Sequence, residues 1–96
     1  MFLLGSREDR AHRRLLARYR DATARVAAAQ QKVSEAVTRY NEALAWATYR
    51  EQVEDAKEIM IEADRKADKV MELEYRVRRE LDAVALRLAG RKREMT

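Results

Sequence analysis

Apolar residues recur along this chain at alternating steps of three and four, in two separate stripes. The first stripe contains Leu15, Tyr19, Ala22, Val26, Ala29, Val33, Ala36, Tyr40 and Ala43. The second contains Val53, Ala56, Met60, Ala63, Ala67, Val70, Glu74, Val77, Leu81, Val84 and Leu88. Because this spacing places side chains on one face of an α-helix, each stripe predicts a long helix with a coiled-coil-like seam.

One seam position of the second stripe carries a charge, at Glu74. The carboxylate either fixes the register of the seam or turns outward while the neighbouring Leu73 takes its place. We favour the second arrangement.

Helix breakers are confined to the two ends of the chain. Glycine occurs only at positions 5 and 90 and proline is absent. The sequence therefore predicts a single helical domain over residues 1–96, with helices over about 6–46 and 49–89 and short tails at 1–5 and 90–96. Near residues 44–49 the register slips, which indicates either a turn or a stammer in one continuous helix. Thr48-Tyr49-Arg50-Glu51 has the form of a capping box and favours the turn.

The charges decide how the helices pair. Residues 1–40 carry net charge +5, residues 41–74 carry −5 and residues 75–96 carry +4. A parallel pair would set each block against its own sign, whereas antiparallel pairing centred near residue 47 sets 20–41 (+2) beside 53–74 (−4). The predicted fold is all-α: a long antiparallel helical hairpin, or a continuous long helix paired antiparallel, coiled-coil-like and oligomeric. The repeat of Ala22, Ala29, Ala36 and Ala43 predicts closely spaced helices.

The chain is short for a stable core of its own. It has 96 residues, 40% of them charged, and 17 of its hydrophobic residues are alanine. A hairpin buries only one face of each helix, so we expect a homo-oligomer. The predicted oligomer seam contains Tyr19, Val26, Val33, Tyr40, Met60, Val70, Val77, Leu81, Val84 and Leu88.

Little in the sequence points to catalysis or to a cofactor. There is no cysteine, one histidine and no glycine-rich phosphate loop. His12 follows Glu8 and Asp9 at a spacing that helical bundles use for di-iron ligands. Arg10 and Arg13 crowd the same turn and would repel a cation, so we expect no metal, no cofactor and no enzymatic activity.

A dense basic cluster is the strongest candidate for function. Arg7, Arg10, Arg14 and Arg18 step along one helical face, and antiparallel pairing brings the C-terminal basic residues to the same end. Arginine suits phosphate and carboxylate partners, which it can contact with two hydrogen bonds. The predicted partner-binding residues are Arg7, Arg10, Arg13, Arg14, Arg18, Arg91, Lys92 and Arg93.

These features favour a non-enzymatic structural or assembly protein, which associates through its seams and docks onto a larger protein complex, such as a virion, through its basic helix ends. The alternative is a helical dimer that binds nucleic acid without sequence specificity, although the cluster lacks the interleaved aromatics of single-strand binders. No apolar run approaches the ~18 residues of a membrane span, and Met1-Phe2-Leu3-Leu4 is too short for a signal-peptide core. We therefore expect a location in the cytoplasm or in an intracellularly assembled particle, without secretion by a classical signal peptide.

Overall fold

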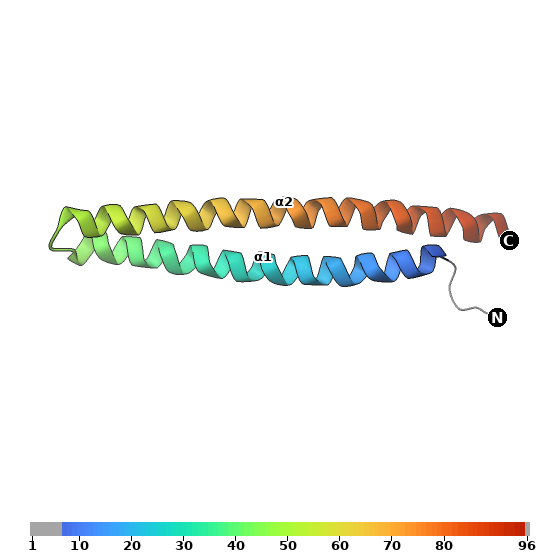
Figure 1. The fold of residues 1–96 in the computed structure, drawn as a ribbon, viewed down its shortest axis with the longest axis horizontal. Helices are drawn as coiled ribbons and strands as arrows, with labels where there is room; N and C mark the ends of the chain where they lie inside the picture. The colour runs from blue at the N-terminus through green and yellow to red at the C-terminus, as the bar shows by residue number, and fades with distance from the viewer. Residues whose placement is uncertain (1–6, 96) are drawn as a thin grey trace.

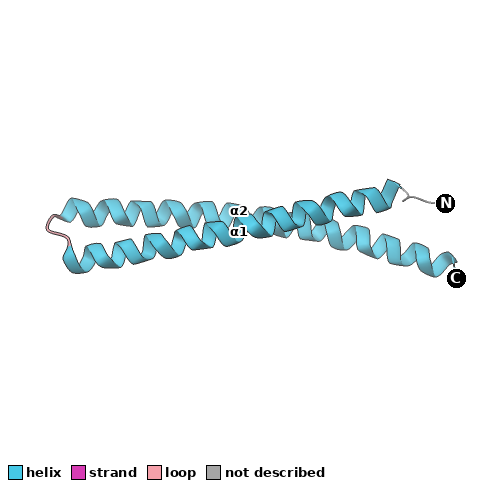
Figure 2. Cartoon of the chain, turned by 90° about the horizontal axis from the view of Figure 1, so that it is seen from below, coloured by secondary structure: helices cyan, strands magenta, loops and turns pink. Residues whose placement is uncertain are grey.

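The computed structural model describes the backbone of residues 7–95 and the side chains of residues 7–91. It contains two long helices, α1 (Arg7–Trp46) and α2 (Arg50–Met95), which lie side by side and run in opposite directions (Figure 1). A view at right angles shows the helices crossing at a shallow angle (Figure 2). The molecule measures 71 × 19 × 15 Å. The all-α antiparallel hairpin is therefore confirmed, and the alternative of one continuous helix is wrong.

The two apolar stripes face each other between the helices. Every position of both stripes is buried or half-buried within the single chain. The buried residues are Leu15, Ala22, Ala36, Ala67, Val77 and Val84. The two most buried of these are alanines, Ala67 at 3% exposure and Ala36 at 5%, so small side chains bring the helices into close contact. The ten predicted oligomer-seam residues are thus buried or half-buried between the two helices of one chain, and their role between copies stays a prediction.

Glu74 keeps its seam position, contrary to our preferred arrangement. Its side chain is half-buried, whereas Leu73 is 51% exposed. A rigid helix cannot rotate one residue into the seam without displacing the seam residues on either side of it. The regular spacing of the stripe therefore outweighs the preference of one leucine for burial.

Residues 47–49 reverse the chain without a glycine. The amide of Ala47 donates to the carbonyl of Ala43 at 2.9 Å and so completes the last turn of α1. Gln52 caps α2: its Oε1 accepts from the amide of Thr48 at 3.0 Å and from that of Tyr49 at 3.2 Å. A glutamine at the third helical position that reaches back to the amide before the helix is half of a capping box. The predicted box at 48–51 is therefore displaced by one residue.

The register of the two helices follows from three contacts between them. Glu8 lies against Arg91, Arg18 against Glu80, and Gln30 against Met71. Interpolation between these contacts places residue 22 opposite a residue near 77, whereas pairing centred on residue 47 would place it opposite one near 72. The difference arises because α1 continues to Trp46 and the chain reverses only after it.

The C-terminal helix is longer than its sequence predicts. We expected it to end near residue 89, but α2 continues through Gly90 to Met95. One glycine inside a helix is unfavourable by about 1 kcal/mol relative to alanine, and the strong helix formers on either side outweigh that loss. The predicted N-terminal tail, residues 1–5, lies outside the described residues.

Candidate functional site

The predicted basic cluster lies at the open end of the hairpin, where α1 begins and α2 ends (Figure 1). Six of its eight residues have described side chains, and all six are exposed. They are Arg7, Arg10, Arg13, Arg14, Arg18 and Arg91. The side chains of Lys92 and Arg93 lie outside the described residues, although their backbone continues α2.

Two of these arginines join the helices to each other. Arg91 Nη1 lies 2.9 Å from Glu8 Oε2, and Arg18 Nη1 lies 3.7 Å from Glu80 Oε2. Both pairs face water over much of their surface, so each contributes less than about 1 kcal/mol. They also indicate which residues of the two helices lie opposite one another. Arg18 and Arg91 are thus partly committed within the chain.

Arg10, Arg13 and Arg14 form a different group. They line a shallow hollow on α1, and none of the ion pairs among residues 7–91 includes them. Three guanidinium groups within two turns repel one another, and an anion placed among them relieves that repulsion. This triad, like Arg7, forms no ion pair among residues 7–91 and is available to contact a partner.

His12 is half-buried at the open end, one turn from Glu8 on the seam side of α1. The Glu8 carboxylate already contacts the Arg91 guanidinium, which would compete with a metal ion for it. Among the residues that the structure describes, no three His, Cys, Asp or Glu side chains gather into a possible metal site.

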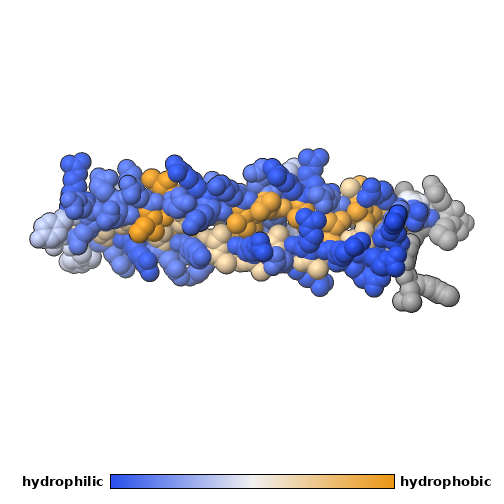
Figure 3. Space-filling view, in the orientation of Figure 1, coloured by the Kyte–Doolittle hydropathy of each residue, from blue (hydrophilic) through white to orange (hydrophobic). Residues whose placement is uncertain are grey.

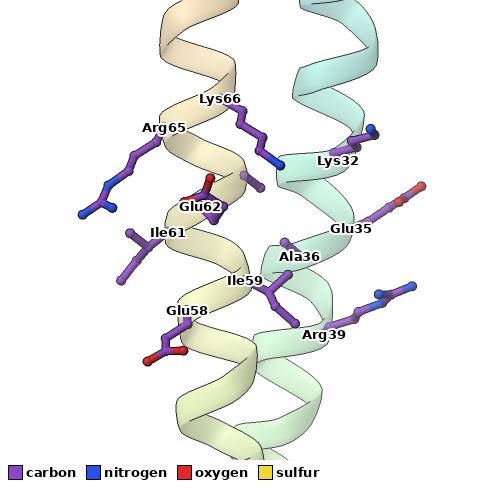
Figure 4. Close-up of a pocket in the computed structure, with 11 residues that line it drawn as sticks. Lys32, Glu35, Ala36, Arg39, Glu58, Ile59, Ile61, Glu62, Arg65 and Lys66 are labelled. Carbon is purple, nitrogen blue, oxygen red and sulfur yellow. The ribbon is translucent and has the colours of Figure 1, made fainter.

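The hairpin also carries a shallow groove nearer to the turn. Its rims hold Lys32 and Arg39 on α1 and Glu62 and Lys66 on α2, with Ile59 between the helices (Figure 4). Both basic and acidic groups line it, and Lys66 points toward α1 (Figure 4). Figure 3 shows one face of the molecule, on which hydrophilic residues surround apolar side chains that run along its middle. We interpret the groove as a solvated surface.

Sequence reasoning missed the aromatic side chains displayed at the turn. Trp46 is 84% exposed and Tyr49 is 68% exposed. The register slip near residues 44–49 carried the signal, because Trp46 and Tyr49 extend the second stripe backwards beyond the start of α2 and do not continue the first stripe. Their exposure at the tip follows from the position of the turn.

Within the described residues, neither helix is long and apolar enough to cross a membrane. A comparison of the chain with protein-family models, with curated proteins and with solved structures gives no match.

Proposed function

We propose that this chain is a non-enzymatic assembly protein, a rigid helical arm that docks through its basic open end onto an acidic surface of a larger protein complex. The observation that supports this most directly is the triad of Arg10, Arg13 and Arg14. Its members are exposed and take part in no ion pair within residues 7–91. An anionic partner would satisfy them.

The charge distribution along the arm supports an end-on contact. Residues 7–28 and 72–91 make up the open half and hold twelve basic and seven acidic side chains, net +5. Residues 29–71 make up the turn half and hold seven and nine, net −2. An acidic partner is therefore attracted by the open half and repelled by the turn half, which orients the arm during encounter.

The test is a pair of matched charge reversals. Arg10→Glu with Arg14→Glu changes two exposed residues four apart in the triad, and Arg65→Glu with Lys69→Glu changes two exposed residues four apart in the turn half. Both double variants bring the formal charge from +4 to zero. Only the first should weaken binding to a labelled polyglutamate peptide, by at least about tenfold, because like charges across a contact cost several kcal/mol.

The choice of probe separates this proposal from nucleic-acid binding. A short DNA duplex is measured beside the peptide at two salt concentrations. Binding of the duplex alone, with steep loss at higher salt, would favour the nucleic-acid alternative. Equal losses for the two double variants would mean that net charge, and not the triad, determines binding.

A further inference from the structure

The charges of α1 are confined to one side of the helix between Ala22 and Trp46. The charged residues there are Arg25, Lys32, Glu35, Arg39 and Glu42. In heptad terms, with the seam at positions a and d, all five occupy positions c and g on the same flank. The other flank, positions b and e, is free of charge over the same stretch.

This uncharged flank follows the same alternating steps of four and three as the seam. Its members are Thr23, Ala27, Gln30, Ser34, Val37, Asn41 and Leu44, and all are exposed. Val37 is 37% exposed and Leu44 57%. The matching flank of α2 borders it, since Gln30 Nε2 lies 4.0 Å from Met71 Sδ. That flank adds three more exposed apolar side chains, Ile61, Met71 and Tyr75. We name these ten residues the neutral face.

The hairpin alone leaves an unusual amount of surface exposed. No side chain among the described residues is fully buried, and the total exposed area is 7946 Å². A compact monomer of 11.3 kDa exposes about 5,700 Å² on the general scaling of area with mass. The excess of roughly 2,200 Å² exceeds the ~800 Å² that one partner contributes to a standard stable interface. A second layer of helices would supply the missing burial.

We propose that a second copy of this chain packs on the neutral face, in the opposite orientation, to form a four-helix bundle. The charges select this orientation. With the two turns at opposite ends, the open half of one copy (+5) lies over the turn half of the other (−2). With the turns together, the two +5 halves lie against each other, which is unfavourable. The uncharged flank of α1 also avoids repulsion between identical surfaces.

The same flank of α2 also carries six charged residues, which are Glu54, Lys57, Asp64, Asp68, Arg78 and Asp82. Two of them, Asp64 and Arg78, fit the same arrangement. A two-fold axis beside Met71 lets that side chain meet its own copy. Asp64 and Arg78 stand seven residues before and after Met71, at the same heptad position, so each carboxylate faces the guanidinium of the other copy. Within one hairpin these residues are fourteen positions apart on a helix, about 21 Å, and do not interact.

Two neighbouring alanines make a matched test. Ala27 lies on the neutral face and Ala28 on the charged flank, and both are exposed on α1. Sedimentation equilibrium should give the wild type twice the chain mass of 11.3 kDa. Ala27→Arg should raise the dimer dissociation constant at least tenfold, and Ala28→Arg should leave it unchanged. Arginine is a good helix former, so circular dichroism should show equal helicity in both variants. A monomeric wild type, or equal loss in both variants, overturns the proposal.

A charge swap tests the orientation. Asp64→Arg and Arg78→Asp should each weaken the dimer, because each sets like charges together across the axis. The double variant should restore it to within about threefold of wild type. Failure to restore overturns the two-fold arrangement. Arg10 and Arg14 lie outside the neutral face, so this proposal and the docking of the basic end can fail independently.

Discussion

Ala67 is the most buried residue of the hairpin, at 3% exposure, and it lies where α2 contacts α1. Ala67→Leu adds three carbons at a contact that has no space for them. Leucine and alanine have similar helix propensities, so the change acts through packing alone. Overpacking a close contact costs about 1–3 kcal/mol. For a domain of this size each kcal/mol lowers Tm by about 4–8 °C, so a 2 kcal/mol penalty lowers it by about 8–16 °C.

The control is Ala83→Leu, which makes the same change at an exposed position of the same helix. It should leave Tm within about 3 °C of wild type, the equivalent of a surface substitution of ±0.5 kcal/mol. Thermal melts followed by far-UV circular dichroism, at one fixed protein concentration, measure both variants. The sign of the change in Tm is decisive, because a gap between the helices would let leucine bury apolar surface and raise Tm. An Ala67→Leu variant that melts at or above wild type would refute the close approach of the helices.

Three further outcomes can be measured on the hairpin. Gly90→Ala should stabilise α2 by about 0.5–1 kcal/mol, seen as a higher Tm, since a Cβ at this helical position meets nothing within 4 Å. Gln52→Ala should lose about 1 kcal/mol in chemical denaturation and Gln52→Glu much less, because only alanine removes the acceptor for the two turn amides; equal losses would exclude this cap. A short cross-linker should join cysteines at 18 and 80 within one chain more readily than cysteines at 18 and 73. The reverse preference would contradict the register indicated by the contact of Arg18 with Glu80.

The periodic part of the fold could be predicted from the sequence, because a helical seam is a repeated signal that many residues share. All twenty stripe positions are at least half-buried, including Glu74. Features that depend on one residue, such as a helix cap or a helix end, were less predictable. Gln52 was not recognised as the cap because several polar side chains near the turn could reach its amides, and only the geometry of the turn selects one. Gly90 predicts a helix end by itself, but its neighbours are strong helix formers and the helix continues.

The basic cluster was likewise predictable in part. The exposure of the basic residues follows from their positions off the seam, and α1 and α2 bring them to one end as expected. Their pairing did not follow from the sequence, since the contacts of Arg18 with Glu80 and of Arg91 with Glu8 depend on a register about five residues away from the predicted one. The uncharged flank of α1 is visible in the sequence as an absence of charge at regular spacing, which is a weaker signal than a cluster of charges.

The start of α1 and the end of α2 lie together at the open end, and this placement determines how the hairpin responds to force. A load that pulls the start of α1 away from the end of α2 opens the seam from that end, one layer at a time, so only a few contacts resist it at any moment. A load applied along the rod, between the tip at residues 47–49 and the open end, is carried in parallel by the whole seam and by two axial ladders of hydrogen bonds. The same contacts therefore make the hairpin resist a load along its axis and yield to a load that separates the two helix ends. The direction in which a partner is attached decides which of these two responses applies.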